Sequence, residues 1–479
     1  MVAVKDKKIF VLAAAMLIVK FALLPLAQNA DSDAACRTWL GLAWLQHPEW
    51  LTHSVWGPFH FYMTGAALAI WNNPVYAPVA LNILLSVVML FPFYYFVKRE
   101  FSPDGAFAAA CLLAASPIIF RNSLMNMSEP PYLLLLVVVL NFLSRGFHGK
   151  ASGNFVFAGL FATIGAGIRF EFWIFIALMA VIILVKTGIK HTLLFLTVAM
   201  LYPLSVLLTH FITDNYSLKG MFREYPWSLH VDQPPPHLTD YLRRIWFYPL
   251  CLLISLGPFV FIAIARIIRT LKLRLGAAWC GSLFVVFYLI TAINALYGTI
   301  FLHARFVSTI SVLGIPFIAP WFAEMTALKK RLAILFVLLT AALSYVYNVG
   351  NITPLPRLSN QTAVQVSGIV NHNLPPGGGL IVDFWEWENT YYVALQTKLG
   401  LDNLCVQEGN VLDSTRRAAI NSIIGRHKQG IILLVKKSLL WQNSAISDST
   451  LKFKFGNQLL NTQLLFDNEQ IKVWRYRYN

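Results

Sequence analysis

The sequence predicts a polytopic α-helical membrane protein with a small α/β domain in its C-terminal part. Of its 479 residues, 57% are hydrophobic and only 13% are charged, which excludes an ordinary soluble globular protein. Long apolar runs recur as far as residue 350, and several reach the roughly 20 residues that a spanning helix needs. Beyond residue 350 polar and apolar residues are mixed, which indicates a domain outside the membrane.

Eleven apolar runs are expected to cross the membrane. They lie near residues 9–27, 75–97, 105–121, 130–144, 153–168, 172–186, 191–211, 245–265, 277–300, 306–323 and 332–350. If the N-terminus is cytoplasmic, the inner segments carry 16 Lys and Arg and the outer loops 8. This bias follows the positive-inside rule and explains the net charge of +16 without a nucleic-acid partner. An odd number of spans then places the C-terminal part on the extracytoplasmic side.

Residues 351–479 are predicted to form this extracytoplasmic α/β domain, after a transmembrane domain at 1–350. Runs with strand character alternate with helix-like runs, namely strands at 380–384, 431–435 and 470–476 and helices at 388–399 and 414–427. The segment 383–388 combines acids with aromatic rings, a mixture that suits sugar binding. Contact between the domain and the membrane explains this segment equally well.

One lysine and two aspartates near the first apolar run are the first candidate functional residues. Lys20 is a charge inside the first expected span, where it either extends to the interface or faces a cavity. Asp31 and Asp33 begin a short helix at about 31–46 that is predicted to lie in the membrane interface. Either aspartate suits a helix cap. At the outer membrane surface, either also suits a base that accepts a proton from a hydroxyl.

Two later outer segments carry further charges. Glu129 follows Ser128 directly before an apolar run, so both residues suit the start of a helix. As an acid on the same side as Asp31 and Asp33, Glu129 also suits the wall of a shared cavity. Arg305 opens the tenth span and either reaches the lipid headgroups or binds a phosphate, for which the guanidinium geometry is suited.

Two other segments allow only general expectations. Arg169 and Glu171 lie between two short spans, where they form either a structural ion pair or part of a cavity wall. The long proline-rich loop at 213–244 suggests a cover laid over a site. Its chemistry is limited to a weak metal signal from His230, Asp232 and His237. No metal or cofactor is expected to be required.

This series of features resembles the type-C (GT-C) glycosyltransferases. The likeness is to the membrane-embedded branch that includes the dolichyl-phosphate-mannose protein mannosyltransferases and the bacterial aminoarabinose transferase to lipid A. That branch has a basic residue in span one and an acidic pair before an interfacial helix, which Lys20, Asp31 and Asp33 match in order. A proline-containing motif comes next in the branch, and Trp56–Phe59, directly before His60, resembles it.

Two later features of the branch are also present. An acidic residue follows span three, here Glu129, and an arginine–aromatic pair opens a late span, here Arg305 with Phe306. Glu129 is therefore a further candidate site residue, together with His60 and His303. The sequence departs from the branch in having a serine between the two acids, which are often adjacent. It also lacks the lysine that precedes the proline of the motif.

The resemblance implies transfer of a hexosyl or pentosyl group from a polyprenyl- or dolichyl-phosphate donor. In such a reaction Asp31 or Asp33 accepts the proton of an acceptor hydroxyl that attacks the anomeric carbon of the sugar. The leaving phosphate-lipid is stabilised by cations, for which the candidates are Arg305, Lys20 and Arg121. The acceptor is expected to be a glycan, a lipid or a protein. The plasma (inner) membrane is the expected location, with the endoplasmic reticulum as the alternative.

Two other classes of protein share part of this pattern. A secondary transporter or lipid flippase also has many spans and intramembrane charges, but the sequence shows no convincing internal repeat of the kind common in transporters. A non-catalytic scaffold would bind a partner through its outer domain. In a scaffold the carboxylates would act as helix caps alone, and their amides would preserve function.

Overall fold

The computed structural model describes most of the chain, in ranges separated by short gaps. These ranges are residues 6–27, 31–48, 56–149, 151–212, 238–298, 300, 302–352, 361–407, 409–447, 449–456 and 459–478. The chain forms two compact units. The first unit comprises Met1–Leu23, Trp50–His60 and Ala80–Asn351, and the second comprises Leu24–Glu49, Phe61–Val79 and Ile352–Asn479.

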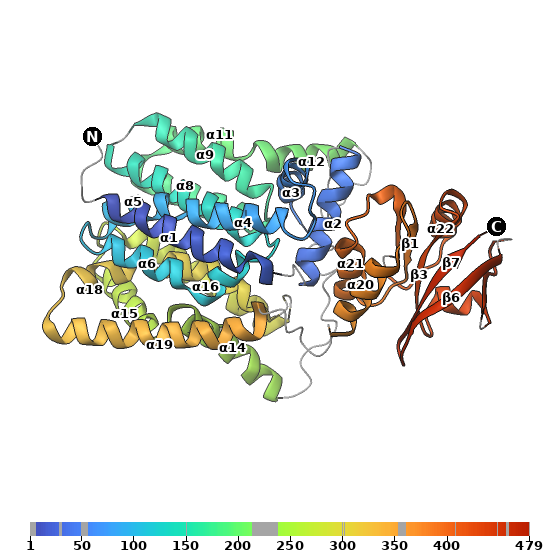
Figure 1. Ribbon diagram of the computed structural model, residues 1–479. Helices are drawn as coiled ribbons and strands as arrows, with labels where there is room; N and C mark the ends of the chain where they lie inside the picture. Colours follow the sequence, from blue (N-terminus) through green and yellow to red (C-terminus); the bar gives the residue numbers. More distant parts are fainter. Residues whose placement is uncertain are drawn as a thin grey trace. The chain divides into compact units, whose positions relative to one another are not determined.

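The first unit is built of helices that pack side by side (Figure 1). Its helices are α1 (Lys7–Leu23), α4 (Ala77–Val88), whose first residues belong to the second unit, α5 (Leu90–Glu100), α6 (Ala106–Ala115), α7 (Pro117–Asn122), α8 (Glu129–Gly149), α9 (Ser152–Ala166), α10 (Glu171–Thr187), α11 (Ile189–Ala199), α12 (Leu201–Ile212), α14 (Leu238–Leu256), α15 (Phe259–Lys272), α16 (Ala278–Tyr297), η3 (Ala304–Phe306), α17 (Val307–Gly314), η4 (Ile315–Ile318), α18 (Ala319–Ala323) and α19 (Ala327–Ile352). The start of α6 packs closely against the backbone of α18. A Cβ atom on Gly105 would lie 1.8 Å from the carbonyl oxygen of Ala319.

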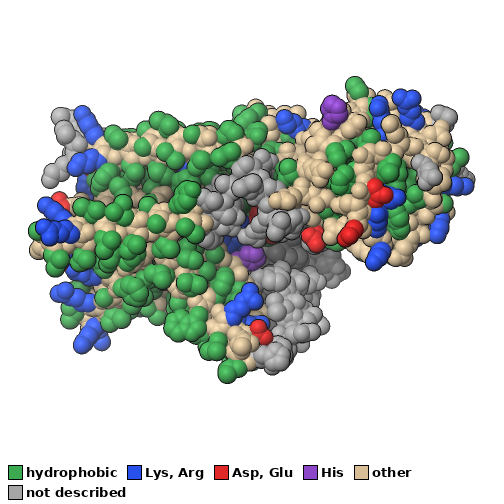
Figure 2. All heavy atoms as spheres, turned by 60° about the horizontal axis from the view of Figure 1, so that its bottom comes forward, with side chains coloured by type: hydrophobic (Ala, Val, Ile, Leu, Met, Phe, Trp, Pro, Cys, Tyr) green, Lys and Arg blue, Asp and Glu red, His purple; other side chains and the backbone are tan. Residues whose placement is uncertain are grey.

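Helix length and composition identify a multi-pass membrane protein. Among the described residues, five helical segments are long and apolar enough to cross a membrane, or seven if each of two bent helix pairs forms one span. Large apolar side chains such as Ile18, Leu84 and Ile293 are exposed on these helices. Figure 2 shows hydrophobic side chains covering the sides of the helices, with Lys and Arg gathered at the left end. Such apolar surface suits contact with lipid.

The expected count of eleven spans is not confirmed. The run at 105–121, expected to be one span, divides into α6 and α7 at Ser116–Pro117. Proline disfavours helical backbone in the residue before it, and Ser116 has an extended ψ of 119°. The run at 153–168 falls on α9, whose 15 residues are fewer than a straight span needs.

The second unit contains a seven-stranded sheet and the helices that pack on it. Its elements are η2 (Leu24–Leu26), α2 (Ser32–Gln46), α3 (Phe59–Ile70), whose first two residues belong to the first unit, α20 (Gln361–Asn373), β1 (Gly379–Val382), α21 (Trp387–Gln396), η6 (Leu401–Asn403), β2 (Leu404–Val406), α22 (Ser414–Arg426), β3 (Gln429–Val435), α23 (Leu439–Gln442), β4 (Ser444–Ile446), β5 (Thr450–Phe453), β6 (Leu459–Asp467) and β7 (Ile471–Arg477). The strand order is β2-β1-β3-β7-β6-β5-β4. Strand β1 is parallel to β2 and β3, and the other pairs are antiparallel.

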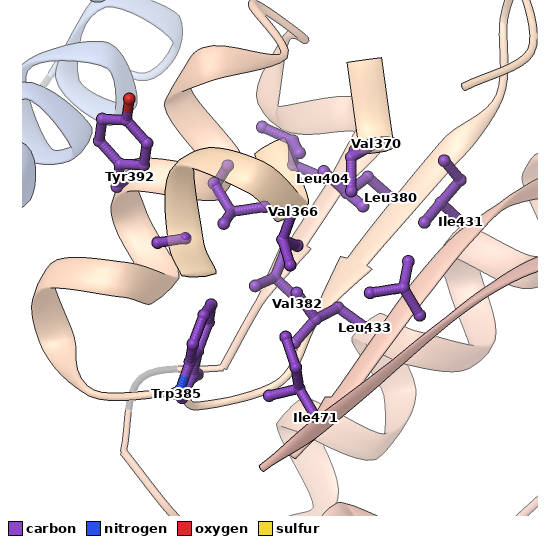
Figure 3. Packing of buried hydrophobic residues seen from close by; sticks show 14 residues of the cluster. Val366, Val370, Leu380, Val382, Trp385, Tyr392, Leu404, Ile431, Leu433 and Ile471 are labelled. Atoms are coloured by element: carbon purple, nitrogen blue, oxygen red, sulfur yellow. The ribbon is translucent and has the colours of Figure 1, made fainter. Parts of the chain in front are cut away.

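Both faces of the sheet are buried at its central strands, which explains why β1 and β3 are continuously apolar. Leu380 and Val382 of β1 belong to the core on the face of α20 and α21, whereas Ile381 belongs to the core on the opposite face. Figure 3 shows Val382 and Leu433 together with Trp385 in the first of these cores. The strands expected at 380–384, 431–435 and 470–476 are thereby confirmed as β1, β3 and β7.

Helix α2 packs between α21 and α3 inside the second unit. Ala35 contacts Tyr391 of α21, and Leu42 belongs to a buried cluster with Leu68 of α3. Gly41 permits close approach to α3, because a Cβ atom there would lie 2.5 Å from Cγ2 of Thr64. The helix expected at about 31–46 therefore exists, while its place in the membrane interface stays a prediction.

Candidate functional site

Asp31 and Asp33 stand at the start of α2. Asp31 is the N-cap, and its Oδ1 accepts a hydrogen bond of 3.2 Å from the backbone N–H of Asp33. The carbonyl oxygen of Asp31 also accepts the first helical bond, 2.9 Å from the backbone N–H of Ala35. The capping interpretation is thus confirmed for Asp31. The role of either aspartate as a base stays a prediction.

Lys20 lies in the interior of the first unit. Its side chain is buried, with 3% of its surface exposed, and Nζ donates a hydrogen bond of 2.8 Å to Oγ of Ser86. The ammonium group also lies 5.2 Å from the centroid of the Phe120 ring. The alternative that this lysine extends to the interface is therefore wrong. A role in donor binding stays a prediction.

Glu129 and Glu171 are joined by one arginine at the adjacent ends of α8 and α10. Arg169 Nη1 donates to Glu129 Oε1 at 2.6 Å and to Ser128 Oγ at 3.0 Å. Its Nη2 and Nε donate to the two carboxylate oxygens of Glu171, at 2.5 Å and 3.2 Å. The guanidinium group also lies over the ring of Tyr132. Arg169 thus uses both sides of its planar fork on carboxylates, the arrangement that guanidinium geometry favours.

Arg305 brings a second cation to this cluster. Its Nε lies 3.8 Å from Glu129 Oε1, and its side chain is only 14% exposed. Phe306 supports both arginines, since the guanidinium carbons of Arg305 and Arg169 lie 5.5 Å and 5.8 Å from the centroid of its ring. Two carboxylates and two guanidinium groups therefore form one compact charge cluster within the first unit.

Arg121 lies on α7, a short helix that contacts several of these elements. Asn122, the next residue, donates from Nδ2 to Ser308 Oγ of α17 at 3.3 Å, and α7 also packs against η3, which carries Arg305. Phe120, the residue before Arg121, is the ring under the ammonium group of Lys20. Helix α7 thus neighbours both of the other predicted phosphate-binding cations.

His60 and His303 occupy different environments in the first unit. His60 is buried, with 2% of its surface exposed, one residue after Phe59, whose backbone N–H donates to Gly167 O. Gly57 of the expected proline motif packs directly on this turn, because a Cβ atom there would lie 2.2 Å from Gly167 O. His303 is exposed and precedes η3.

The sequence did not reveal Arg169 as the partner of Glu129, because 40 residues separate them. The expected ion pair between Arg169 and Glu171 is present and includes Glu129 as a third member, while a place in a cavity wall stays a prediction. The predicted convergence of Glu129 with Asp31 and Asp33 stays a prediction. The predicted metal signal at His230, Asp232 and His237 lies outside the described residues, as does most of the loop at 213–244.

The expectation of a sugar-binding surface at 383–388 is only partly compatible with the structure. Asp383 is buried, and its Oδ2 accepts hydrogen bonds from Val435 N at 2.9 Å and from Ser438 Oγ at 2.5 Å. Trp385 belongs to the hydrophobic core beside the sheet and is 5% exposed (Figure 3). These two side chains hold the loop after β1 in place and are not displayed to a ligand.

Comparisons with known proteins agree with this architecture. Residues 46–212 match the family model described as dolichyl-phosphate-mannose-protein mannosyltransferase. This segment includes Glu129 and Arg169, whereas Asp31 and Arg305 lie outside it. In structure, the chain is similar to ArnT from Cupriavidus metallidurans bound to undecaprenyl phosphate, with a TM-score of 0.65 and 11% identity over 96% of this chain and 97% of that chain. The chain has the fold of ArnT.

Two further solved structures support the same fold. ArnT from Cupriavidus metallidurans in the apo state gives a TM-score of 0.61 at 12% identity, covering 97% of this chain and 98% of that chain. The Archaeoglobus fulgidus oligosaccharyltransferase in complex with Zn and sulfate gives 0.51 at 12% identity, covering 87% and 67%. No curated protein matches the chain. The predicted resemblance to the GT-C glycosyltransferases, in the branch that includes ArnT, is thus confirmed.

Proposed function

We propose that this protein is an integral-membrane glycosyltransferase that moves a sugar from a polyprenyl- or dolichyl-phosphate donor to an acceptor hydroxyl on the extracytoplasmic side. The observation that carries the proposal is the ArnT fold over 96% of the chain, together with the family-model match at 46–212. The ArnT structure was determined with undecaprenyl phosphate, which supports a lipid phosphate as the donor carrier.

In the proposed reaction, Asp31 or Asp33 acts as the general base. The acceptor oxygen forms a bond to the anomeric carbon of the sugar while the bond from that carbon to the phosphate oxygen breaks. The aspartate takes the hydroxyl proton, and the lipid phosphate leaves with the electron pair of the broken bond. The reaction is a substitution without a change of oxidation state, so no oxidant or reductant is needed. The negative charge on the leaving phosphate is stabilised by cations.

Arg305 is proposed as the principal cation for the donor phosphate. Arg169 is committed to Glu129 and Glu171 through bonds of 2.5–2.6 Å, whereas Arg305 approaches Glu129 at 3.8 Å. The contact between Arg305 and Glu129 is weaker than a charge-assisted hydrogen bond, so this one contact competes little with a phosphate. Lys20 and Arg121 are proposed as additional cations for the donor phosphate. Helix α7 carries Arg121, contacts Lys20 through Phe120 and packs on η3, which carries Arg305.

Sugar transfer from a panel of radiolabelled polyprenyl-phosphate sugars tests the proposal in membranes that contain the full-length protein. Asp31→Asn is a sharp variant, because asparagine caps a helix as well as aspartate but cannot accept the proton. Loss of the base is expected to lower turnover by about 10²–10⁴-fold in Asp31→Asn or in Asp33→Asn. Arg305→Ala is expected to weaken use of the donor.

Asp104→Asn is the matched control, since Asp104 is an exposed carboxylate between α5 and α6. It should leave transfer unchanged. The proposal is rejected if no donor in a broad panel is turned over, or if both Asp31→Asn and Asp33→Asn transfer sugar at the wild-type rate. In that case transport of a lipid-linked substrate becomes the next function to measure.

A further inference from the structure

Part of one face of the sheet in the second unit is left uncovered by the described helices. Helices α22 and α23 cover one side of the sheet, and Leu451, Leu460 and Tyr476 belong to the core on that side. On the other side, α20 and α21 cover β1, β3 and the end of β6 near Phe466. Because side chains alternate along a strand, the residues between the buried ones of β5, β6 and β7 face this other side. Six long polar side chains there are exposed or half-buried and define the open half-face: Gln429, Lys452, Asn461, Gln463, Arg475 and Arg477.

The strand register sets five of these side chains in two adjacent rows. Gln429 of β3 lies opposite Arg477 of β7, which in turn lies opposite Asn461 of β6. Arg475, two residues before Arg477, lies opposite Gln463. Neighbouring strands are about 4.8 Å apart, and residues two apart on a strand are separated by about 7 Å. Two guanidinium groups and three amides therefore share one continuous surface about 10 Å wide.

The open half-face is positively charged. Lys452 of β5 adds a third cation, since it lies two residues from Thr450, the partner of Asn461. Among the described residues, no Asp or Glu belongs to the open half-face. Asp467 and Glu469 lie at the opposite end of the β6–β7 hairpin, where Asp467 pairs with two lysines. Asp448, in the turn from β4 to β5, lies outside the described residues.

The polar groups of the open half-face are not used by the fold. Within the described part of the chain, none of the six side chains forms a hydrogen bond or an ion pair. The Nε atom of Arg475 is even buried without a partner there. Arg169 is different, because it uses its guanidinium group on two carboxylates. Arg475 and Arg477 therefore keep their full capacity for an external anion.

The residue types of this surface define the chemistry of a ligand. Guanidinium groups bind carboxylates and phosphates through two parallel hydrogen bonds. Side-chain amides both donate and accept, which suits hydroxyl groups. The described part of the surface has no aromatic ring for stacking a nucleic-acid base. Leu459 is its only large apolar side chain among the described residues, whereas surfaces that insert into a membrane carry several.

We propose that the open half-face binds an acidic oligosaccharide, whose sugars carry carboxylate or phosphate groups. Arg475 and Arg477 hold two anionic groups of the ligand, and the amides of Gln429, Asn461 and Gln463 bind its hydroxyl groups. This site goes beyond the proposed function, because the binding requires no transfer reaction. All six side chains belong to the second unit, so the site is complete within it.

Fluorescence anisotropy tests this binding on the full-length protein in phosphatidylcholine nanodiscs. The labelled probes are hexagalacturonate, which has one carboxylate on each sugar, and a phosphorylated mannan fragment. At least one probe is expected to bind the wild type, and binding should weaken as the salt concentration rises. Arg475→Gln and Arg477→Gln should each weaken binding about tenfold, because each removes a charge-assisted contact. The uncharged methyl ester of hexagalacturonate should bind at least about tenfold more weakly than the acid.

Two further variants separate binding at this surface from effects of net charge and of folding. Arg416→Gln removes the same charge from α22, which packs on the opposite side of the sheet, and should bind as the wild type does. Asn461→Asp places a carboxylate opposite Arg477 and should weaken binding by occupying that arginine. The midpoint of thermal unfolding should not fall in Asn461→Asp, because opposite charges on facing strand residues attract.

The proposal is overturned if neither probe binds the wild type, or if Arg475→Gln and Arg477→Gln both bind as the wild type does. Equal weakening by Arg416→Gln would show an effect of net charge alone and would also overturn it. So would inorganic phosphate that displaces the labelled probe as effectively as the unlabelled oligosaccharide, since the sugar would then not be recognised. Sedimentation of the nanodiscs with phosphatidylglycerol vesicles, without binding of either probe, would make this surface a lipid-binding one instead.

Discussion

Arg169 provides the most direct test of the charge cluster in the first unit, through its replacement by methionine. Methionine preserves most of the aliphatic volume but removes the positive charge and every hydrogen bond to Glu129, Ser128 and Glu171. The side chains of Arg169 and Glu129 are 11% and 4% exposed, so water does little to replace the lost bonds. Among the described residues, Glu129 would keep only its 3.8 Å contact with Arg305.

The expected loss follows from the burial of each partner. Removing one member of a buried ion pair costs about 3–5 kcal/mol, because the charge left behind stays buried. Two features place Arg169→Met at the lower end. Glu171 is 32% exposed and partly hydrated, and Glu129 keeps Arg305 at 3.8 Å. We therefore expect the free energy of unfolding to fall by about 3 kcal/mol.

Equilibrium unfolding by SDS in mixed micelles, followed by tryptophan fluorescence, measures this change. Arg266→Met is the control, because its ion pair with Glu324 has nearly the same length, 2.7 Å, but side chains 22% and 51% exposed. Such a pair contributes about 1 kcal/mol or less. Adding Glu129→Gln and Glu171→Gln to Arg169→Met should restore most of the loss. Equal costs for the two arginine variants, or no recovery in the triple variant, would refute the reasoning.

Two further predictions concern packing and pH. Gly105→Ala should lower the free energy of unfolding by about 1–3 kcal/mol, because its Cβ would lie 1.8 Å from Ala319 O. Gly153→Ala, which has open space around its Cβ, should leave the free energy of unfolding unchanged or raise it. Unfolding by SDS compares the two variants. Burial raises the pKa of Asp383 from 3.8 to about 6. Since the folded protein then holds this proton more tightly than the unfolded chain does, the C-terminal domain should lose about 3 kcal/mol as the pH rises from about 4 to above 6. Asp383→Asn should remove this dependence, as measured by hydrogen exchange of the β1 and β3 amides; a pH dependence that survives in the variant would assign it to other groups.

The parts of the fold that the sequence predicted are those set by local composition. Strands β1, β3 and β7 were predictable because burial on both faces makes their sequences apolar or strongly patterned. Strand β2 has three residues, and β6 is largely exposed, so neither produces such a pattern. The number of spans was not predictable, because hydropathy does not show where a proline such as Pro117 divides an apolar run.

Candidate site residues were predictable as types but not as partners. Glu129 and Asp31 were each recognised as an acid at the start of a helix, and the cap at Asp31 is seen. The bond from Arg169 to Glu129 depends on the packing of α8 beside the start of α10, which local spacing does not report.

In the proposed function, Glu129 helps to position Arg305 for the donor phosphate. A lone carboxylate beside Arg305 would form a short ion pair and compete with the donor. Here Arg169 takes the strong bond to Glu129 at 2.6 Å, and Arg305 remains at 3.8 Å. The ring of Phe306 lies under both guanidinium groups and limits their conformations. In the proposed function, the entropy of ordering Arg305 is therefore lost on folding, and donor binding gains from a cation already in place.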